Sequence, residues 1–220
     1  MSTNTSPTRP VRCRGFALGM WETNCFVLWV EGSPACWIVD AGFEPDPLVE
    51  FARREGLSPE ALVLTHAHVD HIAGVSAVRA AFPGLPVWIH GAEAAWLASP
   101  MLNLSEAAGV PLTAPGPDAT LEHGQELDLA GSRWRVLHTP GHSPGGVALY
   151  CEGGALLLGG DALFAGSVGR TDLPGGDFET LAASIRTRLY TLPDETRVLP
   201  GHGPPTTIGR EKRANPFVKG

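Results

Sequence analysis

The stretch Thr65-His66-Ala67-His68-Val69-Asp70-His71 gathers three imidazoles and one carboxylate within six residues. It directly follows the apolar run 61–64, Ala-Leu-Val-Leu, which is typical of a short buried strand. In an extended segment, two imidazoles separated by one residue point to the same side, and the carboxylate and third imidazole then follow at the start of a helix. The stretch therefore predicts a strand-to-helix loop that can hold two cations side by side.

Three further polar side chains each follow an apolar run and lie in a glycine-rich turn. They are His142 in Thr-Pro-Gly-His-Ser-Pro-Gly-Gly, Asp161 in Gly-Gly-Asp, and His202 in Pro-Gly-His-Gly. Glycines at strand ends allow sharp turns that aim such side chains at a shared point. Each of the three is weak evidence alone, but together with the first stretch they predict one cluster.

The predicted cluster contains only nitrogen and oxygen donors. Seven such ligands exceed the four of a closed structural zinc site, so we expect two metal ions with positions left open for water and substrate. The seven are His66, His68, Asp70, His71, His142, Asp161 and His202. The four cysteines form no Cys-x-x-Cys pair, and we expect them to be reduced packing residues.

Short apolar runs alternate with segments of helical spacing, which predicts mixed sheets covered by helices. We expect one domain over residues 1–220, with residues 1–10 as a disordered tail. Residues 99–119 are rich in proline and glycine and are expected to form a long irregular connection that overhangs a site. Strands are expected at 24–30, 35–39, 61–64, 87–89, 126–129, 134–138, 147–151, 155–158 and 197–199, and helices at 46–55, 72–81, 92–97 and 178–189.

Composition argues against several classes of partner. The formal net charge is −7 and no run is rich in Lys or Arg, so the basic surface that nucleic-acid binding needs is not indicated. No apolar run approaches the roughly eighteen residues that span a bilayer, and residues 1–14 lack the apolar core of a secretory signal. We therefore expect a cytoplasmic protein that acts on a small molecule and binds neither nucleic acid nor membrane.

The ligand pattern resembles the metallo-β-lactamase fold, whose HxHxDH signature is similar to residues 66–71, with the later positions in the same order. The resemblance implies an α/β chain folded as an αββα sandwich of two mixed β-sheets flanked by helices, with the metals at one edge between the sheets. It also implies two divalent ions, zinc in the first place with iron or manganese as alternatives. By this resemblance the first ion is bound by His66, His68 and His142, the second by Asp70, His71 and His202, and Asp161 bridges them.

Segments 166–177, 200–204, 206–211 and 215–217 look most like the short glyoxalase II-like, or hydroxyacylglutathione hydrolase-like, branch. That likeness implies a binuclear thioester hydrolase acting on S-acylglutathione or a related thioester. A metal-bridging hydroxide would attack the thioester carbonyl. Asp70 would bind metal and also orient this nucleophile.

Two residues outside the ligand set are candidates for supporting roles. Arg170 lies in the glycine-rich segment after Asp161, and its guanidinium can bind a substrate carboxylate through two hydrogen bonds. The alternative for Arg170 is an ion pair with Asp172 or Asp177. Asp40 ends an early strand and is expected either to orient a ligand histidine or to form a turn.

The same ligand positions leave other activities open. Persulfide dioxygenases share the fold and a Gly-Arg-Thr-Asp segment similar to 169–172, but use one iron held by two histidines and one aspartate. The following Leu-Pro-Gly-Gly at 173–176 looks more like the hydrolase branch. A lactonase or β-lactamase would use the same hydroxide on a cyclic ester or amide, and a non-enzymatic metal-binding protein would carry the site without turnover.

Overall fold

The structure, a computed structural model, describes residues 9–220. Of the tail expected over residues 1–10, all but Arg9 and Pro10 lies outside the described residues. The strands are β1 (Val11–Leu18), β2 (Thr23–Val30), β3 (Ala35–Val39), β4 (Ser58–Val63), β5 (Val87–His90), β6 (Ala119–Leu121), β7 (Glu126–Leu129), β8 (Ser132–His138), β9 (Val147–Cys151), β10 (Leu156–Gly160), β11 (Leu163–Phe164), β12 (Ser167–Val168), β13 (Arg197–Pro200) and β14 (Thr206–Thr207). The helices are α1 (Asp46–Arg54), α2 (Val69–Ile72), α3 (Val75–Ala81), the 3-10 helix η1 (Gly91–Ala98), α4 (Phe178–Ser184), the π-helix η2 (Ile185–Leu189) and α5 (Ile208–Ala214).

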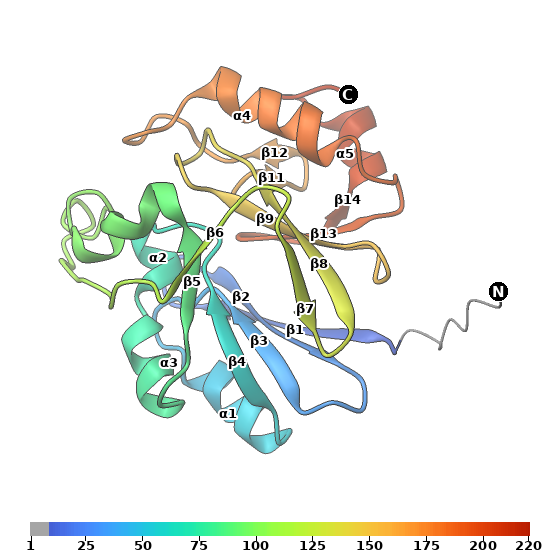
Figure 1. Cartoon of the computed structure of the whole chain (residues 1–220). Coiled ribbons are helices and arrows are strands. Elements are labelled where there is room, and N and C mark those ends of the chain that lie inside the picture. The colour runs from blue at the N-terminus through green and yellow to red at the C-terminus, as the bar shows by residue number, and fades with distance from the viewer. Residues whose placement is uncertain (1–8) are drawn as a thin grey trace.

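The strands form two six-stranded sheets and one small hairpin (Figure 1). The first sheet has the order β1-β2-β3-β4-β5-β6, antiparallel from β1 to β3 and parallel from β3 to β6. The second has the order β14-β13-β10-β9-β8-β7, in which only β10 and β13 are parallel. The predicted pair of mixed sheets is therefore confirmed, and β11 with β12 forms the hairpin.

Alternate side chains of the central strands face different cores, because successive residues of a strand point to opposite faces. On β2, Phe26 and Leu28 lie in the core between the sheets, whereas Cys25 and Val27 face the helices on the first sheet. Burial of both faces explains why these strands read as nearly continuous apolar runs. Figure 1 shows α1 and α3 outside the first sheet and α4 and α5 outside the second, which gives the expected αββα layers. Within residues 9–220, no helix has the length and apolar character needed to cross a membrane.

The single helix predicted over residues 72–81 is wrong, because α2 and α3 are separate helices. Gly74 lies between them and packs on the loop after β3, where its N–H donates to the carbonyl of Ala41 (2.8 Å). A Cβ atom on Gly74 would lie 2.4 Å from the carbonyl oxygen of Gly42, so only glycine fits this position. The contact ends α2 after one turn and holds it against the first sheet.

Two larger elements were not predicted from the sequence. The strand β1 lies at a sheet edge, and Arg12 and Arg14 on its exposed face interrupt the apolar pattern that would have identified it. The helix α5 is short, and it begins after Thr207, whose hydroxyl accepts the N–H of Arg210 (3.3 Å). The strand β1 pairs with the following strand β2, and α5 contacts the distant Gly166 through Glu211.

Candidate metal centre

The seven predicted ligands converge at one edge of the sandwich. Four come from the loop after β4 and from α2, and three follow β8, β10 and β13 of the second sheet. In chain order they are His66, His68, Asp70, His71, His142, Asp161 and His202. The cluster therefore spans the two sheets, with four side chains from one and three from the other.

Three overlapping groups of these side chains have ligand atoms within 4.8 Å of one another. The groups are His66, His68 and His142; His66, His71 and Asp161; and Asp70, His71 and His202. The first and last groups match the two ion positions that the resemblance implies. One carboxylate oxygen of Asp161 lies 3.5 Å from Nε2 of His71, and the other lies 3.6 Å from Nε2 of His142. Asp161 thus lies between the two groups, where a bridging ligand has to be.

Several donor atoms of the cluster are buried without a partner, although buried polar atoms are nearly always hydrogen-bonded. Among the described residues 9–220, these atoms include Nε2 of His66, Nε2 of His71 and Oδ1 of Asp161. Unprotonated imidazole nitrogens and carboxylate oxygens are ligands that zinc and related divalent ions accept. The side chains therefore fit a metal centre on a structural ground that is separate from the sequence motif.

A buried carboxylate outside the ligand set orients two of the histidines. Asp40 Oδ2 accepts hydrogen bonds from Nδ1 of His71 (2.8 Å) and from the hydroxyl of Thr65 (2.8 Å), and that hydroxyl also contacts Nδ1 of His66 (3.1 Å). With each Nδ1–H donated in this way, Nε2 is left free to bind metal. Asp40 adopts a left-handed backbone with φ of 60°, which aspartate and asparagine tolerate better than most residues. Of the two roles expected for Asp40, the structure supports the orienting one.

Backbone carbonyls orient two more ligand histidines. Nδ1 of His142 donates to the carbonyl oxygen of Arg170 (2.8 Å), and Nδ1 of His202 donates to that of Trp21 (3.1 Å). Each contact turns Nε2 toward the cluster, where that of His202 lies 3.0 Å from Asp70 Oδ2. Neither carbonyl contact was predicted, because main-chain acceptors leave no mark in a sequence.

Burial and neighbouring charges set the protonation of the cluster. Burial, reinforced by the adjacent imidazoles, lowers the pKa of His66 well below its ordinary value. Burial also lowers the pKa of His68 to about 3. Burial acts to raise the pKa of Asp161, but the neighbouring His71, whose Nε2 lies 3.5 Å from Oδ1, outweighs it, and the pKa lies below its ordinary value. At neutral pH His66 and His68 are therefore neutral and Asp161 is charged, the forms that bind a cation. Burial acts to lower the pKa of His71, but the charges of Asp70, Asp161 and Asp40 outweigh it and raise that pKa well above its ordinary value, so a cation bound at Nε2 would displace a proton.

The substitution Asp40→Asn is expected to weaken metal binding by about 10–100-fold, the usual cost of losing an outer contact of a ligand histidine. Asparagine keeps the size and tolerates the positive φ, but its NH2 group must face either the Thr65 N–H or Nδ1–H of His71. Competition with a chromogenic chelator would measure the zinc dissociation constants. Asp128→Asn, which alters an exposed aspartate on β7, is the control, and equal affinities in both variants would exclude an orienting role.

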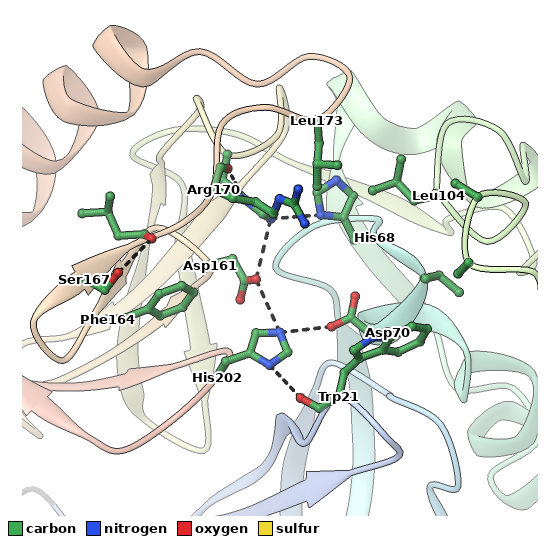
Figure 2. A pocket seen from close by; sticks show the side chains of 15 residues that line it. Trp21, His68, Asp70, Leu104, Asp161, Phe164, Ser167, Arg170, Leu173 and His202 are labelled. Atoms are coloured by element: carbon green, nitrogen blue, oxygen red, sulfur yellow. Dashed lines mark hydrogen bonds and ion pairs between the residues drawn. The ribbon is translucent and has the colours of Figure 1, made fainter. Parts of the chain in front are cut away.

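The cluster forms the floor of a pocket of about 590 Å³ (Figure 2). The pocket walls are mainly apolar and come from the β1–β2 turn, from the connection between η1 and β6, and from the region around β11 and β12. The apolar wall residues are Trp21, Val69, Leu104, Ala107, Ala108, Phe164, Val168 and Leu173. A hydrogen bond from the N–H of Val69 to the carbonyl of Asn103 (2.8 Å) ties the connection to α2. Of the connection predicted over residues 99–119, Leu104, Ala107 and Ala108 line the pocket.

Arg170 lines the pocket, but its guanidinium is also paired. Its Nε and a terminal nitrogen lie 2.7 and 2.8 Å from the two carboxylate oxygens of Asp172, and both side chains are exposed. Arg170 therefore both lines the pocket and forms the ion pair with Asp172 that was one of the two alternatives expected for it. Thr23 is a contributor that sequence reasoning missed, since its hydroxyl donates to Asp70 Oδ2 (2.9 Å) from the start of β2.

The remaining histidines and cysteines lie outside the cluster. His90 and His138 stack on each other with ring centroids 4.0 Å apart, and His123 contacts Arg188. The four cysteines are free within the described chain, as expected. None of these residues belongs to the three ligand groups.

A family model and curated proteins match most of the chain. The family model described as Metallo-beta-lactamase superfamily matches residues 18–202. "Probable metallo-hydrolase YqgX" of Bacillus subtilis is 40% identical over 211 residues, which are 96% of this chain and 99% of that protein. "Hydroxyacylglutathione hydrolase GloC" of Haemophilus influenzae is 36% identical over 200 residues, which are 90% of this chain and 93% of that protein.

Solved structures match over a similar extent. The BLEG-1 B3 metallo-beta-lactamase has a TM-score of 0.90 and 42% identity, covering 95% of this chain and 100% of that one. TTHA1623 in a di-iron-bound form has a TM-score of 0.83 and 43% identity, covering 93% of this chain and 100% of that one. The similarity therefore includes both sheets and every ligand-bearing loop.

Proposed function

The chain belongs to the metallo-beta-lactamase superfamily and is a metal-dependent hydrolase of that family, and from this premise we propose that it hydrolyses thioesters. The proposed substrates are S-acylglutathiones or related thioesters, as in glyoxalase II. The relative GloC, named as a hydroxyacylglutathione hydrolase and 36% identical, supports this choice of substrate class. The proposed ions are zinc, with iron or manganese as alternatives, since a di-iron form is known for the structural neighbour TTHA1623.

The observation that carries the proposal is the pair of ligand groups joined by Asp161 at the floor of an open pocket. Two bound divalent ions would supply a water of lowered pKa and a Lewis acid for the carbonyl oxygen of the substrate. A binding site made only for structure would be closed to solvent, whereas five of the ligands line this pocket. A thiolate leaves readily, so the site needs no strong general acid.

Asp70 is proposed to orient the attacking water by accepting a hydrogen bond from it. Its carboxylate lines the pocket and is fixed by the hydroxyl of Thr23 (2.9 Å) and by Nε2 of His202 (3.0 Å). Burial acts to raise the pKa of Asp70, but the charge of His71 and the contacts with His202 and Thr23 outweigh it and hold the pKa well below its ordinary value. The carboxylate is therefore ionised at neutral pH and able to accept a hydrogen bond from water.

The pocket walls suit an apolar acyl group. Besides the ligands, the lining residues are apolar except for Ser167 and Arg170. Glutathione carries two carboxylates, whereas Arg170 supplies the one guanidinium among the described lining residues that could bind a carboxylate. We therefore propose that the acyl chain contributes more to binding than the thiol portion.

The test is hydrolysis of a series of thioesters by the metal-loaded protein, followed by thioester absorbance. With one common thiol, kcat/KM is expected to rise about two- to fourfold per added methylene until the pocket is filled, because each buried methylene contributes about 0.8 kcal/mol. S-lactoylglutathione and the same acyl groups on the neutral thiol N-acetylcysteamine belong to the series. Chelator-treated enzyme is the control.

Absence of chelator-sensitive turnover on every thioester would overturn the proposed activity. Turnover that does not depend on chain length would retain the thioesterase and remove the role of the apolar wall. The second candidate is β-lactam hydrolysis, which the 42% identity to a B3 metallo-beta-lactamase favours, and a chromogenic cephalosporin tests it. Oxygen uptake with glutathione persulfide, together with elemental analysis for iron, tests the dioxygenase alternative.

A further inference from the structure

Glu93 is a buried carboxylate that lies outside the ligand set and close to it. It belongs to η1, its side chain is 0% exposed, and no ion pair with it occurs within residues 9–220. Burial raises the pKa of Glu93, while the Ser143 side chain and hydrogen bonds from two backbone amides oppose that effect. Burying a carboxylate without a cation is costly, so its hydrogen-bond partners are the feature to explain.

The two oxygens of Glu93 connect the two loops that carry the first ligand group. Oε2 accepts the N–H of Ala67 (2.5 Å), and Oε1 accepts the N–H of Gly145 (2.6 Å). Ala67 lies between His66 and His68, and Gly145 lies three residues after His142. One side chain therefore joins the β4 loop of the first sheet to the β8 loop of the second.

The fit around this carboxylate is tight. A Cβ atom on Gly145 would lie 2.9 Å from Cγ of Glu93 and 3.1 Å from its carboxyl carbon. The absence of a side chain at this position lets the Gly145 N–H approach the carboxylate. Glu93 therefore holds the ends of the two loops together next to the ligands, whereas the backbone hydrogen bond from Val147 N–H to the Thr65 carbonyl oxygen (2.8 Å) joins them farther back.

We propose that Glu93 is a positioning residue that fixes the separation of His66 and His68 from His142, and thereby the affinity of the first ion position. The inference rests on the proposed metal centre and is independent of which substrate is hydrolysed. Figure 2 shows His68 directed into the pocket, so a shift of its loop would displace a ligand directly. Loss of the two Glu93 hydrogen bonds is expected to affect the first ion position, which uses His66, His68 and His142. The second ion position uses a different group, Asp70, His71 and His202.

The main variant is Glu93→Gln, which keeps the volume but replaces one acceptor oxygen by an NH2 group facing a backbone N–H. The affinity of the first position is expected to fall by about 10–100-fold, while the position formed by Asp70, His71 and His202 keeps its affinity. Titration of the metal-free protein with zinc measures both constants. The absorption spectrum of the cobalt-loaded protein should change in the same variant, because it reports the ligand geometry.

Glu211→Gln is the matched control. Glu211 is also buried (1% exposed), and it accepts the N–H of Gly166 (2.9 Å) and a hydrogen bond from Thr206, but it lies on α5 outside the ligand groups. Both variants are expected to lower the melting temperature, because each leaves a buried donor unpaired. Only Glu93→Gln should alter zinc affinity and the cobalt spectrum.

Unchanged zinc affinity and an unchanged cobalt spectrum in Glu93→Gln, with a stability loss like that of Glu211→Gln, would overturn the proposal. If Glu93→Gln fails to fold, Gly145→Ala tests the same contact, since the added methyl group displaces the Glu93 side chain. A selective loss of affinity in Gly145→Ala supports the proposal, and wild-type affinity opposes it. Neither readout uses catalytic turnover, so failure of the proposed thioesterase activity would leave this test intact.

Discussion

Asp161→Ala is expected to lower kcat/KM by about a thousandfold or more, which exceeds the 10–100-fold typical of losing an outer contact of a ligand. The reason is that Asp161 contacts both ligand groups, with one oxygen 3.5 Å from His71 and the other 3.6 Å from His142. Without the carboxylate, the two positions lose their shared ligand and part of the negative charge that attracts two cations. Metal content should fall together with turnover.

The measurement combines thioester hydrolysis with elemental analysis of the same preparation. Asp161→Asn separates charge from shape, because the amide keeps the volume and one acceptor but carries no negative charge. Asp128→Ala provides a control for loss of a carboxylate outside the site. Full activity and full metal content in Asp161→Ala would contradict the bridging role.

Removal of the metal ions is expected to abolish hydrolysis and to lower the melting temperature by about 8–16 °C. A ligand present at a thousand times its dissociation constant stabilises the folded state by about 4 kcal/mol, and about 1 kcal/mol shifts the melting temperature of a chain of this size by 2–4 °C. We expect the melting temperature to fall because the Nε2 atoms of His66, His68 and His71 are buried and have no hydrogen-bond partner within the described chain. Without a metal ion these three atoms stay unpaired, which destabilises the folded state.

Calorimetry with and without chelator, followed by re-addition of zinc, iron or manganese, would measure this effect. The metal that restores both melting temperature and turnover is the one on which the enzyme depends. The Asp161→Ala variant should show a smaller chelator-dependent shift, since it starts with less metal. An unchanged melting temperature in the wild-type protein would mean that the ions contribute nothing to stability.

The clustering of the seven candidate ligands could be predicted from the sequence because their signal is local. Three imidazoles and a carboxylate follow one strand, and each later ligand stands in its own glycine-rich turn. The structure explains why glycine is needed in one of these turns. A Cβ atom on Gly201 would lie 2.0 Å from Oδ1 of Asp161, inside the cluster. Local composition and close packing therefore point to the same positions.

The residues that support the ligands could not be predicted in the same way. Thr23 and Glu93 reach the centre from elements that carry no ligand, and only the packing of the sheets brings them there. Arg170 was expected to act through its guanidinium, whereas its carbonyl group holds His142. The side-chain role of Arg170 stays a prediction that the pocket geometry permits.

Strands with both faces buried could be predicted from the sequence, because their apolar runs are nearly continuous. Strands at the sheet edges were harder to predict. The edge strand β1 was missed because its exposed residues are charged. The break between α2 and α3 was missed because Gly74 is required by contact with another loop, and not by a helix-breaking pattern nearby. The first miss reflects an exposed strand face, and the second reflects a contact between residues about thirty positions apart.

The distribution of ligands along the chain has a consequence for the order in which the protein is made. The first group lacks His142 and the second lacks His202 until those residues have been synthesised. Roughly 130 residues separate His71 from His202, and at about 5–20 residues per second a ribosome needs on the order of ten seconds to add them. During that time the HxHxDH segment is an incomplete and weak ligand set. A complete ligand set therefore exists only once His202 has been added, and we expect the ions to bind after synthesis rather than during it.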